Sequence, residues 1–228
     1  LREIAEVLDK SLGAYIISLD GNEQYNDVAG VAALLDAIEG DGRLSHFNHS
    51  ILFVEQPISR AVALDVDVSA LSARKPVILD ESDAFLGAFA KGRALGYRGV
   101  SSKTCKGFYK SILNAARCAQ WGVGYFMSGE DLTTQAGISV QQDLALVNLL
   151  GITHLERNGH HYVNGMSGMP AEEQAAFLAA HPDIYHMGNG VTRLTIRDGR
   201  IALGSLDRVG FAYGAEPDFS VMREMRHG

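Results

Sequence analysis

The segment from residue 50 to residue 103 contains three short apolar runs, SILFVEQ (50–56), PVILDE (76–81) and YRGVSSK (97–103). Each run is followed by a longer stretch that is typical of a helix. The runs are nearly continuous in apolar residues, which favours strands buried on both faces of a parallel sheet. This alternation predicts βα units.

The same alternation extends to both sides of that segment. Further strands are predicted at AYIISLD (14–20), VGYFMSG (123–129) and GITHLE (151–156). Helices are predicted at LREIAEVLDK (1–10), VAGVAALLDAIEG (28–40), VSALSAR (68–74), AFLGAFAKGRALG (84–96), FYKSILNAARCAQWG (108–122) and VQQDLALVNLLG (140–151). Units of about 25 residues suit one strand, one helix and two short loops. We therefore predict an α/β fold, a TIM-type (β/α) barrel with six consecutive parallel strands.

The pattern changes after residue 156. A loop rich in Gly, His and Asn precedes a predicted helix at 170–181, and VTRLTIRDGRIALG (191–204) is predicted to be a hairpin that turns at Asp198 and Gly199. Residues 1–160 are thus predicted to form barrel units. Residues 161–228 are predicted to form a C-terminal extension with a helix and a hairpin.

Composition narrows the class of protein. The 228 residues are 46% hydrophobic, and no uncharged apolar run is long enough to cross a bilayer. A net charge of -7 offers no electrostatic footprint for nucleic acid. Cys105 and Cys118 form no CxxC motif, which argues against a disulfide scaffold or a structural zinc site. We expect a cytoplasmic protein that binds neither nucleic acid nor membrane.

Every predicted strand ends in or next to an ionisable side chain. These residues are Asp20, Glu55, Asp80, Lys103, Glu130 and Glu156. In a parallel barrel the carboxyl ends of the strands share one face, where active sites lie. Ionisable side chains at strand ends can also serve only to solvate loops or cap helices, but six in register favour a common site.

Three carboxylates from adjacent strands are hard oxygen ligands that suit Mg²⁺. Asp20, Glu55 and Asp80 are the predicted ligands, and Glu81 competes with Asp80 for the third position. A lysine on the next strand, close to a divalent cation, would have a lowered pKa and could act as a general base. The combination suits abstraction of a proton α to a carboxylate, with the cation neutralising the developing enediolate.

The motifs SLDGNEQY, FVEQP, VILDES, VSSKTCKG and HLE, in this order, resemble the barrel of the enolase superfamily in its mandelate racemase and muconate lactonizing enzyme branch. The resemblance covers roughly residues 10 to 160. It implies Mg²⁺ ligands at Asp20, Glu55 and Asp80 and a catalytic lysine at Lys103. It also implies that the C-terminal extension, residues 161–228, belongs with a capping domain. Glu156 is similar to the acid that contacts the substrate carboxylate, and it joins Lys103 among the catalytic candidates.

The chain also departs from the resembled pattern. A complete member has an N-terminal capping domain, two earlier barrel strands and a K-x-K motif, and none of these is in the sequence. We therefore expect either a fragment of a longer protein or a numbering that begins after a removed region. Where the mandelate racemase group carries a seventh-strand His, this chain has Glu130 or Asp131.

Other candidates for substrate binding each have a plainer alternative. Asn22 can orient the metal or the substrate, or simply form a turn. Lys106 can contact a substrate anion or be a solvated loop residue. Arg157 can bind a carboxylate through two hydrogen bonds or form a surface ion pair. His160 can line the pocket or donate to a substrate oxygen. Glu130 and Asp131 are also predicted to bind substrate.

The function predicted from these residues is Mg²⁺-dependent removal of the α-proton of a small carboxylate substrate such as an acid sugar. Dehydration, epimerisation and cycloisomerisation share this first step, and the sequence leaves the choice among them open. The alternative is a catalytically incomplete fragment or a non-catalytic homologue of the same superfamily. A metal-dependent aldolase or hydrolase on the same barrel finds no supporting residues. The resemblance also implies a homo-oligomer.

Overall fold

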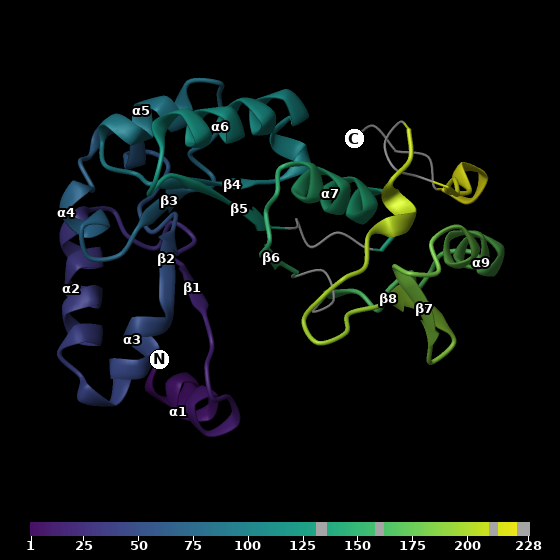
Figure 1. Cartoon of the computed structure of the whole chain (residues 1–228), viewed down its shortest axis with the longest axis horizontal. Coiled ribbons are helices and arrows are strands. Elements are labelled where there is room, and N and C mark those ends of the chain that lie inside the picture. Colours follow the sequence, from purple (N-terminus) through teal and green to yellow (C-terminus); the bar gives the residue numbers. More distant parts are fainter. Residues whose placement is uncertain (131–135, 158–161, 210–213, 223–228) are drawn as a thin grey trace, which may run out of the picture. The chain divides into compact units, whose positions relative to one another are not determined.

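A computed structural model describes residues 1–130, 136–157, 162–209 and 214–222 (Figure 1). The chain divides into two compact units. The first joins Leu1–Ser102 to Tyr109–Ser128, and the second joins Lys103–Phe108 to Gly129–Gly228. Within the described part of the chain, no helix combines the length and apolarity needed to cross a bilayer.

Six strands follow one another along the chain, as predicted. They are β1 (Ile17–Asp20), β2 (Ile51–Glu55), β3 (Val77–Leu79), β4 (Gly99–Ser102), β5 (Phe126–Glu130) and β6 (Leu155–Glu156). Their hydrogen-bonding order is the chain order. The pairs β1–β2, β2–β3, β3–β4 and β5–β6 are parallel. The predicted fold class, consecutive units of a (β/α) barrel, is confirmed, although most of the strands are shorter than predicted.

The helices alternate with the strands. They are α1 (Arg2–Ser11), α2 (Val28–Glu39), α3 (Ser45–Ser50), α4 (Ser69–Ser72), α5 (Ala88–Ala94), α6 (Phe108–Trp121), α7 (Ile138–Leu149) and α9 (Ala171–Ala180). In the first unit every residue of β3 is buried, as expected for a strand covered on both faces. A Cβ at Gly92 of α5 would lie 2.7 Å from Leu79 Cδ1, so glycine lets this helix approach β3 closely.

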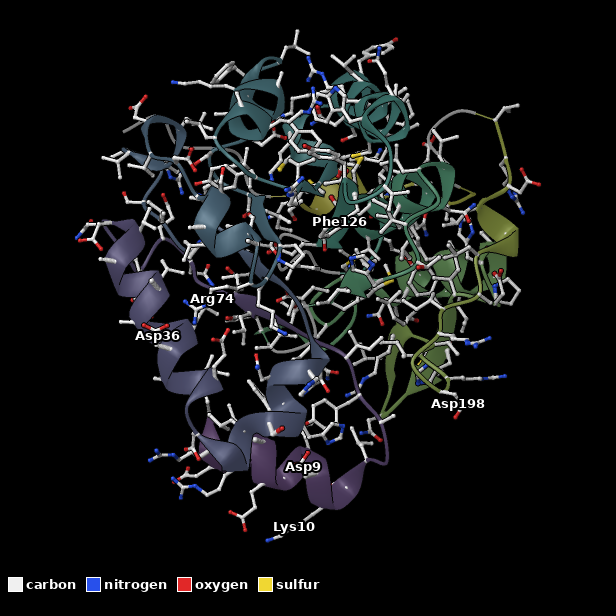
Figure 2. The ribbon with its side chains drawn as sticks, turned by 60° about the vertical axis from the view of Figure 1, so that its left-hand side comes forward. Asp9, Lys10, Asp36, Arg74, Phe126 and Asp198 are labelled. Carbon is white, nitrogen blue, oxygen red and sulfur yellow. The ribbon has the colours of Figure 1, made fainter. Side chains whose placement is uncertain are left out.

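Polar contacts also join the helices of the first unit. Arg74, just after α4, reaches back to α2 with Nη2 2.8 Å from Asp36 Oδ1 and 2.9 Å from Glu39 Oε2 (Figure 2). At the start of β5, the ring of Phe126 lies 5.6 Å from the ring of Phe53 on β2. The aromatic contact is part of the buried interior, whereas the exposed ion pairs add little to stability.

Helix α2 begins with a side-chain cap. Asp27 Oδ1 accepts a hydrogen bond of 2.8 Å from the backbone N–H of Gly30. We expect Asp27→Ala to lower the free energy of unfolding by about 1 kcal/mol, the usual loss for an N-cap. Asp27→Asn keeps an oxygen acceptor and is the matched control. Urea unfolding followed by circular dichroism measures both, and an equal loss in the two variants would contradict the capping role.

The second unit contains β6, α7, α9 and a two-stranded antiparallel sheet of β7 (Tyr185–Gly188) and β8 (Val191–Leu194). Residues from α7, α9 and β7 share one hydrophobic core, among them Leu144, Phe177 and Tyr185. The boundary predicted at residue 160 stays a prediction. The described residues on both sides of it contribute to this core.

The prediction of a hairpin at 191–204 is wrong about which residues form the two strands. The observed hairpin covers residues 185–194 and turns at Asn189 and Gly190, whose φ values are 52° and 77°. Asp198 and Gly199 do form a turn with positive φ, at an exposed tip (Figure 2), but only the bridge between Arg197 and Arg200 flanks it. The first hairpin forms because Tyr185 and Thr192 are buried, whereas residues 195–200 are not.

A buried histidine closes α9. His181 Nε2 accepts a hydrogen bond of 3.0 Å from the N–H of Gly214, so Nδ1 carries the proton and donates to Ser205 Oγ at 2.9 Å. Burial lowers the pKa of His181, and the positive charge of Arg208 lowers it further, while Asp183 acts in the opposite direction. The lowered pKa favours the neutral form of the ring. Its two hydrogen bonds connect the end of α9 to Ser205 and Gly214 in the C-terminal segment.

The folded protein takes up this proton at a lower pH than the unfolded chain does. We expect stability to fall as the pH drops below about 6.5, the ordinary histidine pKa, towards the lowered pKa, and then to stop falling. One such group contributes a slope of at most about 1.4 kcal/mol per pH unit. Urea unfolding across this range measures it. His181→Gln should flatten the slope, whereas the control His49→Gln should not.

Candidate functional site

In the first unit, acidic side chains stand at the carboxyl ends of three neighbouring strands. Asp20 ends β1 and is in register with Glu55, which ends β2, and Asp80 directly follows β3. Glu55 and Asp80 are only 2% and 5% exposed. Their nearest carboxylate oxygens lie within 4.8 Å of each other. The structure therefore brings two of the three predicted metal ligands together.

Asp20 differs from the other two because it is exposed and held by its own loop. Its Oδ1 accepts from the backbone N–H of Asn22 at 2.9 Å, and its Oδ2 accepts from Asn22 Nδ2 at 2.7 Å. Asn22 has a φ of 40° and thus forms a turn as well as orienting a predicted ligand. The turn predicted for Asn22 is present, and its role toward a metal or a substrate stays a prediction. Asp20 as a metal ligand stays a prediction.

Further acids gather around this pair. Burial raises the pKa of the Glu81 carboxyl, and the negative charges of Asp80, Glu23 and Asp20 raise it further. Arg60 supplies positive charge: its Nη2 lies 2.6 Å from Glu23 Oε2, and hydrogen bonds from Arg60 lower the pKa of Glu23. Like-charged carboxylates in a partly desolvated site disfavour their ionised forms unless a cation compensates them.

The donor set fits a divalent cation. Glu55 and Asp80 offer buried carboxylate oxygens close enough to share one ion, and Mg²⁺ prefers oxygen ligands of this kind. Between the two rival residues for the third ligand, Asp80 rather than Glu81 is grouped with Glu55.

In the second unit, the predicted lysine is paired with an acid. Lys103 Nζ lies 2.7 Å from Glu130 Oε2, and these side chains are 8% and 13% exposed. Glu130 ends β5, and Lys103 directly precedes the short helical turn Thr104–Lys106. The sequence had suggested Glu130 as a substrate contact and gave no signal of this pairing. A buried ion pair of this kind fixes the position of the amine.

The turn after Lys103 is held from α7. The buried carboxylate of Asp143 accepts hydrogen bonds from the backbone N–H of Thr104, at 2.9 Å, and from the Thr104 hydroxyl. Sequence reasoning missed Asp143, which looks like an ordinary polar residue of a predicted helix. Its partner Thr104 lies 39 residues away in the chain, so the contact can be recognised only in the folded structure.

The remaining candidates have different outcomes. Glu156 ends β6 in register with Glu130 and is half-buried, as are the neighbouring Arg157 and the more distant Lys106. Lys106 lies in the turn after Lys103 and donates its backbone N–H to the Lys103 carbonyl at 3.0 Å. Two further candidates, Asp131 and His160, lie outside the described residues. The catalytic or substrate roles assigned to all of these residues stay predictions.

Comparisons with known proteins bear on the fold. No family model and no curated protein matches the sequence. Among solved structures, an enolase superfamily member from Enterococcus faecalis V583 has a TM-score of 0.56 at 14% identity, over 84% of this chain and 46% of its own. A mandelate racemase/muconate lactonizing enzyme from Roseiflexus sp. has a TM-score of 0.56 at 18% identity, over 85% and 50%.

The L-Ala-D/L-Glu epimerase from Bacillus subtilis is similar at a TM-score of 0.54 and 15% identity, over 84% of this chain and 48% of its own. This chain thus spans about half the length of each solved structure it matches. At these identities the likeness concerns the fold. The resemblance seen in the sequence motifs is confirmed at that level: the chain has part of the barrel found in enolase superfamily structures.

Proposed function

We propose that this protein is a Mg²⁺-dependent enzyme that removes the α-proton of a small carboxylate substrate. The observation that carries the proposal is the order of side chains at three successive strands: Glu55 at the end of β2, Asp80 directly after β3 and Lys103 directly after β4. Two adjacent buried acids followed by a lysine are what such chemistry needs, because carboxyl ends of parallel barrel strands serve one site.

Asp20, Glu55 and Asp80 are the residues that would hold the ion. When bound, Mg²⁺ supplies positive charge against the substrate carboxylate, which makes the α-proton more acidic. Asn22 orients the Asp20 carboxylate through two hydrogen bonds. Arg60 neutralises the negative charge of Glu23 through an ion pair at the edge of the acidic cluster. The negative charges of the other acids would then be balanced by the ion.

Lys103 is the group that would accept the proton at Nζ once its ammonium form has lost a proton. A divalent cation close to it would favour that loss, whereas the negative charge of Glu130 opposes it. Its ion pair with Glu130 and the Asp143–Thr104 bonds hold the amine on a short turn rather than on a loose loop. Such preorganisation is useful because a base must lie within hydrogen-bond reach of the proton that it removes. We assign Glu156, Lys106 and Arg157 to the substrate side of this site, on their position at or after strand ends.

Racemase, lactonizing enzyme and epimerase appear in the names of structures with a similar fold, which favours an isomerase or lyase. The test is incorporation of solvent deuterium. The protein would be incubated in D₂O with Mg²⁺ and with a panel of acid sugars, 2-hydroxy acids and an Ala-Glu dipeptide, and loss of the α-proton signal would be followed by NMR. Exchange that stops with EDTA supports the proposal.

The alternative is a non-catalytic homologue that keeps the acidic cluster. It predicts binding of Mg²⁺ with no deuterium in any substrate of the panel. That outcome would reject the enzymatic proposal.

A further inference from the structure

Gln56 lies between the two buried acids in the hydrogen-bond network of the first unit. It directly follows Glu55, and its side chain is fully buried. Its Oε1 accepts from the backbone N–H of Asp80 at 2.9 Å and of Ser82 at 3.1 Å. Its Nε2 donates to Ser82 Oγ at 2.7 Å and to the Ile58 carbonyl at 2.8 Å. One side chain thus joins the end of β2 to the loop after β3.

The main chain of Gln56 adds two more links. Its N–H donates to the Ile78 carbonyl of β3 at 3.0 Å, and its carbonyl accepts from the N–H of Glu23 at 2.9 Å. The loops after β1, β2 and β3 therefore meet at this residue. They are the loops that follow Asp20, Glu55 and Asp80.

Both polar atoms of the Gln56 carboxamide have hydrogen-bond partners of the right kind. The amide orientation is fixed because the oxygen faces two N–H donors, while the nitrogen faces a carbonyl oxygen and a hydroxyl. A carboxylate at this position would set oxygen against the Ile58 carbonyl, and an apolar side chain would leave the buried groups unpaired. Only a glutamine-like amide satisfies the four partners.

The backbone at Gln56 is held in an unfavourable conformation. Its φ is 30°, in a region that residues with a side chain rarely adopt. Such a conformation persists where the surrounding structure over-determines it, often at functional sites. The hydrogen bonds of the side chain supply that constraint here.

We infer that Gln56 is a positioning residue, which fixes the main chain of Asp80 relative to Glu55 and so sets the separation of the two carboxylates for a divalent ion. The inference rests on the proposed function, in which these acids hold Mg²⁺. It adds a residue that touches neither metal nor substrate, and it explains how acids on two strands are kept close despite their repulsion.

The variant that tests this is Gln56→Asn. Asparagine tolerates positive φ better than glutamine does, so the fold is kept, but its side chain is one methylene too short to reach Asp80 and Ser82. Gln56→Met is the second variant, with similar volume and no hydrogen bonds. The control is Tyr97→Phe, which removes a buried hydrogen bond of 3.0 Å to the Ala63 carbonyl in the same unit, away from the acids.

Two readouts are needed. Calorimetry with Mn²⁺ alone should show binding about 10-fold to 100-fold weaker in both Gln56 variants, the usual loss when a residue supporting a metal ligand is removed. Tyr97→Phe should bind as the wild type does. Hydrogen exchange of the metal-free proteins should show faster exchange at the Asp80 and Ser82 amides in the Gln56 variants only.

Unchanged Mn²⁺ affinity in the Gln56 variants, or unchanged exchange at the two amides, would overturn the inference. An equal loss of affinity in Tyr97→Phe would also overturn it, because that loss would report general destabilisation. Absence of Mn²⁺ binding to the wild type is a different failure, that of the proposed function. In that case the exchange experiment alone decides whether Gln56 fixes the Asp80 main chain.

Discussion

Lys103→Met is expected to abolish exchange of the substrate α-proton with D₂O for at least one stereoisomer that the wild type exchanges. A positioned general base contributes about 10²–10⁴-fold to such a step, and methionine keeps most of the length of the buried stem while removing the amine. Mg²⁺ affinity should stay close to that of the wild type, because Lys103 is not among the proposed ligands. NMR of the α-proton and calorimetry with Mg²⁺ measure the two effects.

Lys106→Met is the matched control for this experiment. Lys106 lies three residues later, half-buried in the turn that follows Lys103. Its loss should weaken substrate binding at most and leave the exchange step in place. Exchange at the wild-type rate for every isomer in Lys103→Met would end the assignment of the base, and loss of exchange in Lys106→Met alone would move it to that residue.

Asp80→Asn is expected to weaken Mg²⁺ binding by more than about 100-fold, beyond the range found when only a supporting residue is lost. The amide keeps the shape of the side chain, but it removes a negative charge that is 5% exposed and close to Glu55. Calorimetric titration with Mg²⁺ measures this outcome.

Asp65→Asn supplies the comparison for charge alone. Asp65 belongs to the same unit, with a side chain that is 70% exposed and 3.0 Å from Lys91 Nζ. Its loss changes the net charge by the same amount without touching the acidic cluster, so Mg²⁺ affinity should not change. Equal affinity in Asp80→Asn and the wild type would reject Asp80 as a ligand.

Much of the fold could be predicted from local patterns. The run VIL in β3 is buried at every residue, and a continuous apolar run already indicates this because a strand covered on both faces needs no polar side. The helical stretches were predicted from apolar spacing in the same way, and α2 begins within the predicted range at the residue after its Asp27 cap. Strand ends were less accurate, since the pattern of side chains does not say where pairing stops.

The hairpin shows where local patterns run out. Asn189–Gly190 and Asp198–Gly199 both adopt positive φ, so both dipeptides are competent turns. Turn chemistry alone does not choose between them. Burial of Tyr185, whose hydroxyl accepts a hydrogen bond of 2.9 Å from Gln141 of α7, favours the first as the turn of a true hairpin. That partner lies 44 residues away.

The strand order, the acids at the strand ends and the lysine after β4 could all be predicted from the sequence, because each is a local feature within a regular repeat. The approach of Glu55 to Asp80, the pairing of Lys103 with Glu130 and the four hydrogen bonds of the Gln56 side chain are visible only in the folded protein. Apart from the hydrogen bond from Gln56 to the Ile58 carbonyl, these contacts join residues 24 or more positions apart. Their geometry depends on register and packing between neighbouring strands, which no single segment encodes.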